Sequence, residues 1–205
     1  MSSSSLDLDT PHGPARIHLH PVADPRGALV LGHGAGGGVA APDLVAVARV
    51  AGEAGFTVAL VEQPYRVAGR KSPAPARQLD TAWESVLEQL RADALEGLGV
   101  IVGGRSSGAR VACRTAAGSG ARAVLCLAFP LHPPGKADDP AKSRLPELGL
   151  VEAPVLIVQG EGDPFGMPPG APGRTVVRVP GNHSLRSTAA VGEAVSGWLT
   201  SDAWS

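Results

Sequence analysis

Seven short apolar runs, each bounded by glycine or proline, are the feature that most limits the folds open to this chain. Most of them contain hardly any polar residue, which is typical of strands buried on both faces of a parallel sheet. The runs are Arg16–His20, Ala28–His33, Thr57–Glu62, Gly99–Gly103, Ala123–Ala128, Val155–Gln159 and Thr175–Val179. The first run alternates polar and apolar residues instead, which predicts an edge strand with one wet face.

Amphipathic segments separate these runs. In Pro42–Ala54 and Ala76–Ala94, apolar residues recur at intervals of three and four, as they do on the buried face of a helix. A third helix is predicted after Ser107, and a last one turns Val191 and Trp198 inward. This alternation predicts one α/β domain, a mostly parallel sheet of about seven strands with helices on both faces. Ligands of such sheets bind at the carboxyl ends of the strands.

Length and charge narrow the class of protein further. With 205 residues the chain fits a single domain, which we expect over residues 14–200 after a flexible segment at 1–13. The formal net charge of -1 does not favour nucleic acid or an anionic membrane as a partner. The start lacks the pattern of a secretory signal and no apolar run could cross a bilayer, so we expect a cytoplasmic monomer or homodimer. Cys113 and Cys126 are expected to be free, buried thiols.

One predicted strand runs directly into Gly104-Arg105-Ser106-Ser107-Gly108, a match to the pattern G-x-S-x-G. In this pattern the serine sits on a tight, strained turn between a strand and a helix. A Cβ on the flanking glycines would collide with neighbouring backbone there. Alone the match is weak in a glycine-rich chain, because a βα turn with a capping serine gives the same pattern.

Three further strand ends carry residues that complement this serine. The glycine-rich segment Gly32–Gly38 follows the second run. Asp163 lies on a tight turn after the sixth run, and His183 lies in the same position after the seventh. Because parallel strands bring their carboxyl ends to one edge of a sheet, we expect these residues to lie near the serine.

A serine, an aspartate and a histidine at one edge of the sheet suit nucleophilic catalysis. We expect Ser106 to be the nucleophile and His183 its base. Asp163 is expected to hold the imidazole in the required tautomer. The backbone N–H groups of Ala35 and Ser107 are expected to stabilise the oxyanion.

These residues resemble those of the short, cap-less predicted α/β-hydrolases akin to the dienelactone hydrolase family. The resemblance extends over about residues 26–199 and rests on four segments. They are His33-Gly34-Ala35-Gly36-Gly37, Gly103-Gly104-Arg105-Ser106-Ser107-Gly108, Pro130-Leu131-His132-Pro133-Pro134-Gly135 and Gln159-Gly160-Glu161-Gly162-Asp163-Pro164-Phe165-Gly166. It implies a single-domain α/β-hydrolase fold without a separate cap domain. The predicted triad makes the chain a candidate serine esterase or thioesterase that needs no cofactor. Without a cap the site should be open, so we expect substrates with small acyl groups.

The resemblance has two limits. Dienelactone hydrolases use a cysteine nucleophile where this chain has Ser106, so lactone substrates are not implied. The related eukaryotic group also contains chromatin-complex subunits without established catalysis, which leaves a non-catalytic interaction protein as an alternative.

Several residues near the same strand ends are candidates for binding substrate. Three cations and an aromatic residue in loop 63–75 could hold a carboxylate or phosphate, although a solvated basic loop is the simpler interpretation. Arg105 could orient the turn or form a surface ion pair, and His132 is the one credible substitute for His183. The candidates are Gly34, Tyr65, Arg66, Arg70, Lys71, Arg105 and His132.

A dinucleotide site is a weaker alternative. Gly32, Gly34 and Gly37 fit G-x-G-x-x-G after a strand, and Glu62 ends the next strand, where a ribose-binding acid would stand. In that motif the third glycine lies in the first helical turn. Here Pro42 marks a helix start several residues later.

No metal site and no full lid are predicted. His18 and His20 share a strand face but have no further ligand at metal-binding spacing nearby. Segment Phe129–Pro154, where cap domains usually enter this fold, is too short and too rich in proline for a separate cap, although it could form a partial lid.

Overall fold

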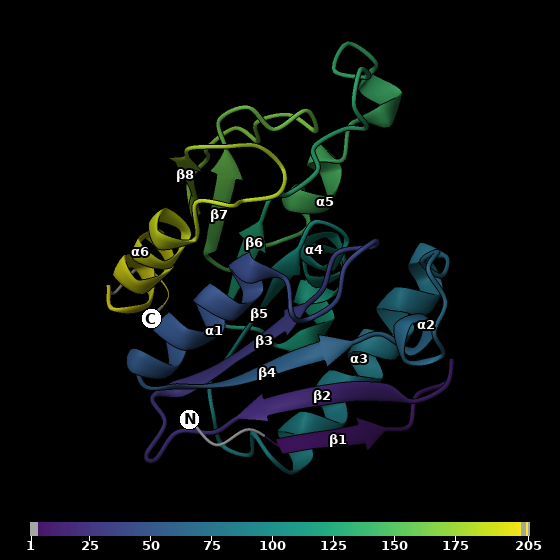
Figure 1. Cartoon of the computed structure of the whole chain (residues 1–205), viewed down its shortest axis with the longest axis vertical. Coiled ribbons are helices and arrows are strands. Elements are labelled where there is room, and N and C mark those ends of the chain that lie inside the picture. Colours follow the sequence, from purple (N-terminus) through teal and green to yellow (C-terminus); the bar gives the residue numbers. More distant parts are fainter. Residues whose placement is uncertain (1–3, 202–203, 205) are drawn as a thin grey trace.

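An eight-stranded sheet forms the centre of the computed structural model, which describes residues 4–201 and 204 (Figure 1). Its strand order is β1-β2-β4-β3-β5-β6-β7-β8. Strands β4, β3, β5, β6, β7 and β8, which are neighbours in this order, run parallel to one another. Strand β2 pairs antiparallel with both β1 and β4. The bounds are β1 Ser4–Leu8, β2 Ala15–His20, β3 Gly27–Gly32, β4 Phe56–Glu62, β5 Val100–Arg105, β6 Ala123–Leu127, β7 Val155–Gly160 and β8 Arg174–Val179.

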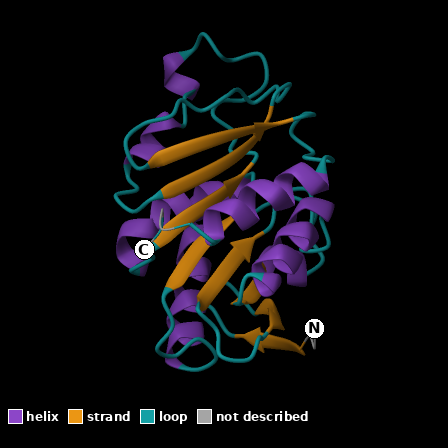
Figure 2. Cartoon of the chain, turned by 90° about the vertical axis from the view of Figure 1, so that its left-hand side faces the viewer, coloured by secondary structure: helices purple, strands orange, loops and turns teal. Residues whose placement is uncertain are grey.

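Helices cover both faces of this sheet (Figure 2). Helices α1 (Pro42–Glu53) and α6 (Thr188–Leu199) bury their apolar residues against one face. Helices α3 (Ala76–Ala92) and α4 (Ser107–Ser119) do so against the other. Three shorter helices lie in connections, namely α2 (Pro64–Val67), the 3-10 helix η1 (Pro140–Lys142) and α5 (Leu145–Gly149). The predicted α/β architecture, with its mostly parallel sheet between two helical layers, is confirmed.

The amino-terminal edge of the sheet differs from the prediction. Residues Ser4–Leu8, placed in a flexible segment by the sequence analysis, form β1 and pair with β2. The sheet therefore has eight strands rather than seven, and β2 is an inner strand rather than an edge. Strand β1 forms because its residues alternate between two sides. Leu6 and Leu8 pack against the core, while Asp7 on the opposite side pairs with Arg16 at 2.8 Å.

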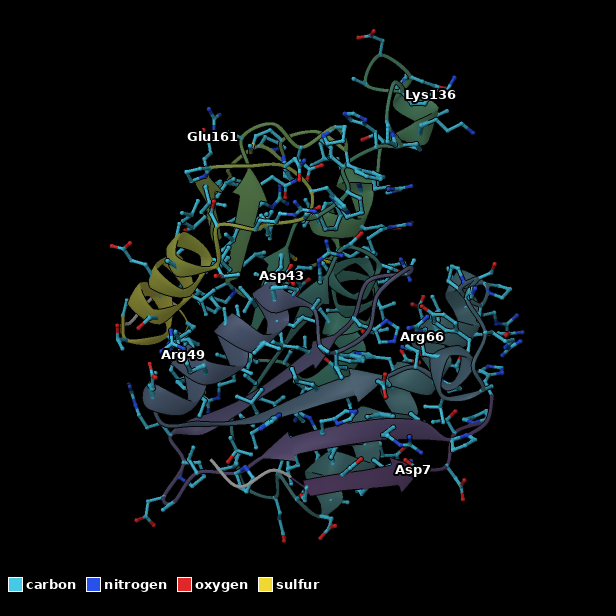
Figure 3. The ribbon with its side chains drawn as sticks, in the orientation of Figure 1. Asp7, Asp43, Arg49, Arg66, Lys136 and Glu161 are labelled. Carbon is cyan, nitrogen blue, oxygen red and sulfur yellow. The ribbon has the colours of Figure 1, made fainter. Side chains whose placement is uncertain are left out.

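Segment 129–154 is anchored near both ends, where Phe129 and Leu148 are fully buried, and projects in between. Its α5 is tied to α4, because Glu147 accepts hydrogen bonds from Arg110 and Arg114. The part around Lys136 projects beyond the end of β7, at the top of Figures 1 and 3. It forms no domain of its own. The free thiols of Cys113 and Cys126 are both buried, as predicted, with their sulfur atoms 3.6 Å apart.

Candidate active site

Ser106 occupies a strained turn between β5 and α4. Its backbone lies at φ 52° and ψ -107°, in the region that residues with a side chain rarely adopt. The two glycines of the motif lie against Gly32 at the end of β3. A Cβ on Gly104 would lie 2.5 Å from the Gly32 carbonyl oxygen, and one on Gly108 would lie 2.6 Å from its carbonyl carbon. The collisions predicted from the sequence are therefore confirmed.

His183 bridges Ser106 and Asp163. Its Nε2 lies 2.9 Å from the Ser106 Oγ, and its Nδ1 lies 2.8 Å from the Asp163 Oδ2. The three side chains come from three different strand ends: the serine follows β5, the aspartate follows β7 and the histidine follows β8. With its proton on Nδ1, the imidazole donates a hydrogen bond to the carboxylate. Its Nε2 is then free to accept a hydrogen bond from the serine hydroxyl. The three residues expected to act together thus form one hydrogen-bonded chain.

The Asp163 carboxylate is fully buried and has two further donors. Its Oδ1 accepts the backbone N–H of Phe165 at 2.8 Å. Its Oδ2 accepts the side-chain amide of Gln159 at 2.8 Å, and the same amide nitrogen lies 2.9 Å from the Gly166 carbonyl oxygen. Gln159 is itself fully buried, and the sequence analysis did not assign it to the site. One signal was available, namely a polar residue at the end of an otherwise apolar strand.

Phe165 is a second residue that the sequence analysis did not assign. Its ring lies 4.2 Å from the His183 ring, centroid to centroid, with the planes inclined by 34°. An aromatic face at this distance stabilises a positive charge on the imidazole. The position follows from the Asp163 turn, because the N–H that binds the carboxylate belongs to Phe165 itself.

The two segments predicted to supply N–H groups for an oxyanion lie beside Ser106. Ser107 is the first residue of α4, and the first N–H groups of a helix have no acceptor within it. The loop that carries Ala35 approaches from the other side, since a Cβ on Gly34 would lie 3.7 Å from the Ser106 Cβ. A Cβ at position 34 would also lie 2.9 Å from Nη1 of Arg105, so a larger residue there would have to displace the guanidinium group.

Tyr65 stabilises the loop of Ala35 through a hydrogen bond. Its hydroxyl donates to the Ala35 carbonyl oxygen at 2.9 Å, and only 2% of the residue is exposed. Its hydroxyl is thus engaged within the protein instead of being free to bind substrate. His33 is buried beside Tyr65. Its Nδ1 lies 2.8 Å from the Gly34 carbonyl, its Nε2 accepts the Gln63 N–H, and burial lowers its pKa.

The structure separates the three cations of the predicted basic loop. Arg66 lies on α2, with its Nη2 3.8 Å from the position of a Cβ on Gly38, beside the glycine-rich loop (Figure 3). Arg70 and Lys71 are exposed farther along the chain. Of the three, Arg66 is the one that the fold brings to the loop of Ala35.

His132 does not take the place of His183. Its ring packs against Gly166, and its Nδ1 lies 2.9 Å from the Pro133 carbonyl oxygen. Its backbone N–H donates to the Phe165 carbonyl. His132 therefore supports the turn that carries Asp163 from outside.

Arg105, the residue before Ser106, faces into the protein. Its Nε donates to the Asp43 Oδ2 at 2.7 Å, and its Nη2 donates to the backbone carbonyl of His183 at 3.0 Å. Asp43 lies in the first turn of α1, near the middle of Figure 3. Of the two interpretations of Arg105, the surface ion pair is wrong.

Comparison with known proteins now decides the family. The family model of the α/β hydrolase domain matches residues 25–196, which are most of the chain. The chain belongs to the α/β-hydrolase family.

Several solved structures share this fold across nearly their full lengths. A lidless α/β serine hydrolase from Xanthomonas campestris superposes with a TM-score of 0.73 at 22% identity, over 97% of this chain and 96% of the other. A serine hydrolase homologue from Coxiella burnetii gives 0.76 at 15% identity, over 98% and 99%. Dienelactone hydrolase from Anabaena variabilis gives 0.74 at 18% identity, over 96% of each chain. Within residues 4–201 and 204 this member of the family forms a single domain, and segment 129–154 builds no separate cap.

The competing kinds of site find little support in this hydrolase. The helix after the glycine-rich loop begins at Pro42, so Gly37 is not in a helical turn as a dinucleotide motif requires. Glu62, which that motif would use to bind a ribose, has its Oε2 3.2 Å from the His18 Nε2. Within residues 4–201 and 204, no three histidine, cysteine or acidic side chains cluster as metal ligands would. None of the helices in that part of the chain has the length and apolar character to cross a membrane.

Proposed function

We propose that this protein is a serine esterase or thioesterase that cleaves esters of small acyl groups through Ser106, His183 and Asp163. The observation that carries the proposal is the continuous hydrogen-bonded chain from the Ser106 hydroxyl through the imidazole to a fully buried carboxylate. The strained turn at Ser106 supports it, because such strain persists where a nucleophile must be held clear of its neighbours.

The first half of the reaction forms an acyl-enzyme. The Ser106 oxygen attacks the acyl carbon while its proton passes to Nε2 of His183, and Asp163 stabilises the resulting imidazolium. The negative oxygen of the tetrahedral intermediate accepts the N–H groups of Ala35 and Ser107, each worth about 3 kcal/mol of barrier. The carbon–oxygen or carbon–sulfur bond then breaks, and the leaving group takes the proton from His183.

The second half returns the enzyme to its starting state. A water molecule gives a proton to His183 and attacks the acyl carbon, and collapse of the second intermediate restores the proton to the Ser106 oxygen. The products are a carboxylic acid and an alcohol or thiol. Nothing in this sequence of steps calls for a metal or an organic cofactor.

The substrate class follows from the surroundings of Ser106. No helix or strand of residues 4–201 and 204 forms a separate cap over the strand ends, which favours small substrates bound in an open site. Arg66 adds a positive charge beside the glycine-rich loop, where Glu62 lies equally near Gly38 and pairs with His18. In this proposal Arg66 favours esters that carry a carboxylate or phosphate. Phe165 supplies an apolar surface next to His183. Small acyl esters with an anionic end are therefore the proposed preference.

Labelling with a fluorophosphonate probe, followed by peptide mapping, tests the proposal. An active serine hydrolase labels at Ser106 and hydrolyses p-nitrophenyl acetate. A non-catalytic interaction protein neither labels nor hydrolyses the ester. A dinucleotide-binding protein fails to label and instead changes its tryptophan fluorescence when NAD(P) is added. Labelling at any other residue contradicts the assignment of the nucleophile.

A further inference from the structure

Apart from His183 and Asp163, Arg105 and Asp43 form the most deeply buried ion pair among the described residues. The two side chains are 17% and 1% exposed, and the bond between Nε and Oδ2 is 2.7 Å long. Burial raises the pKa of the Asp43 carboxyl, while the charge of Arg105 opposes that shift. Because an ion pair gains little stability from burial, its position calls for another explanation.

The guanidinium group of Arg105 makes a second contact that such an explanation can use. Its Nη2 donates to the main-chain carbonyl of His183, a residue 78 positions away in the sequence. Its Nη1 packs over Gly34, where a Cβ would lie only 2.9 Å away. One rigid side chain therefore touches the start of α1, the loop of Ala35 and the loop of His183.

The loop of His183 is held from its other side by the turn that carries Asp163. The Gly162 N–H donates to the Gly181 carbonyl at 2.8 Å, and a Cβ on Gly160 would lie 2.5 Å from the Asn182 carbonyl oxygen. These contacts fix His183 relative to Asp163 but not relative to Ser106. Arg105 is bonded directly to Ser106 in the chain, so its hydrogen bond to His183 supplies that second constraint.

We propose that Arg105 is a positioning residue which, oriented by Asp43, holds His183 in line with Ser106 through the His183 main-chain carbonyl. This inference rests on the proposed function. Asp43 turns the planar guanidinium so that Nη2 faces the carbonyl, because Nε and Nη2 lie in one fixed plane. Neither residue touches the reacting atoms.

Two variants at this pair separate positioning from folding. Arg105→Lys keeps a positive charge beside Asp43 but replaces the planar fork by a single ammonium group. The double variant Asp43→Asn with Arg105→Met removes both charges and leaves no unpaired ion in the interior. Both variants lack the oriented donor to His183. The matched control is Arg114→Met, since Arg114 is also 17% exposed and pairs with Asp80 at 2.6 Å, while Glu147, its second partner, keeps its hydrogen bonds from Arg110.

The measurements are kcat and KM for p-nitrophenyl acetate, the rate of fluorophosphonate labelling, and Tm. A misplaced base costs about 100-fold in rate, so we expect both site variants to lose about that factor in kcat and in labelling rate. We expect their KM to change by less than about three-fold, because acyl binding does not use Arg105. Arg114→Met should lower Tm comparably and keep kcat within about three-fold of the wild type.

Two results would overturn the inference. One is a folded double variant whose kcat matches the wild type, and the other is a loss of kcat in Arg114→Met as large as that of the site variants. Should the double variant not fold, Arg105→Lys decides the question by the same criteria. Should the wild-type protein neither label nor hydrolyse the ester, the proposed function fails instead, which is a distinct outcome.

Discussion

Replacing Gln159 tests how the site holds its buried acid. The amide nitrogen of Gln159 lies within 3.0 Å of three acceptors, the Asp163 Oδ2 and the carbonyl oxygens of Phe129 and Gly166. An amide has two N–H groups, so it supplies about one hydrogen bond to a charged acceptor and one to a neutral acceptor. Such bonds contribute about 2 and about 1 kcal/mol. Gln159→Leu, which keeps the volume, therefore loses about 3 kcal/mol of favourable contacts.

Part of this loss is offset. The Gln159 Oε1 is buried and has no hydrogen-bond partner in residues 4–201 and 204, a condition that costs about 1–3 kcal/mol and ends when leucine replaces the amide. We therefore expect the free energy of unfolding to fall by only about 0–2 kcal/mol. The catalytic effect should be larger. Asp163 loses a donor and the turn loses its tie to Phe129, so kcat should fall at least about ten-fold.

Urea unfolding followed by tryptophan fluorescence measures the stability change, and p-nitrophenyl acetate hydrolysis measures kcat. Gln78→Leu is a matched control, because Gln78 is exposed on α3 and should change neither quantity. A kcat of Gln159→Leu equal to that of the wild type would refute the reasoning, whatever the stability. So would a stability loss above about 4 kcal/mol with full activity in the remaining folded protein.

Gln159→Glu adds a test with a definite sign. The introduced carboxyl faces three acceptors, so only its protonated form can donate to Asp163, and its pKa is raised in the folded protein. A group with a raised folded pKa stabilises the protein most below its unfolded pKa of about 4.3 and loses that contribution as the pH rises. The stability of Gln159→Glu relative to the wild type should therefore fall from about pH 4 to pH 7. A flat difference over that range contradicts the hydrogen-bond assignment.

Three further predictions concern the reacting groups and the substrate. Ser106→Ala should lower ester hydrolysis by about 10⁴-fold or more with an unchanged circular dichroism spectrum, and half-retained activity would refute the nucleophile. His183→Ala should abolish turnover while His132→Ala retains most of kcat; the reverse result would exchange their roles. Arg66→Ala should raise KM for an anionic ester but not for a neutral one, whereas Arg70→Ala should alter neither. Equal effects of Arg66→Ala on both esters would contradict the anionic subsite.

The elements of the sheet could be predicted because their signals are local. Each inner parallel strand is an apolar run, and α1 begins at Pro42, as the sequence analysis expected. The strand β1 could not be found in the same way, since Ser4–Leu8 offers only Leu6 and Leu8 as inward residues. Its stability comes from pairing with β2, which no local pattern reports.

The candidate site likewise contains residues with a local signal in the sequence and residues without one. Ser106, Asp163 and His183 each stand on a turn after an apolar run, so their meeting at one edge follows from the parallel sheet. The roles of Arg105 and Asp43 depend on a contact across 62 residues. Asp43 looks like an ordinary acid in the first turn of a helix until the fold brings Arg105 to it.

The close packing of three glycines links the turn at Ser106 to the loop of Ala35. In the sheet register Gly32 stands beside Gly104, so β3 and β5 end at the same level. Gly108 then packs on Gly32, and the chain leaving β3 must pass directly over Ser106. A side chain at Gly104 or Gly108 would therefore displace the nucleophile and the oxyanion loop together. The Ser106 hydroxyl and the loop of Ala35 must act on the same acyl carbon. The packing of the Ser106 turn on Gly32 therefore fixes the positions of both.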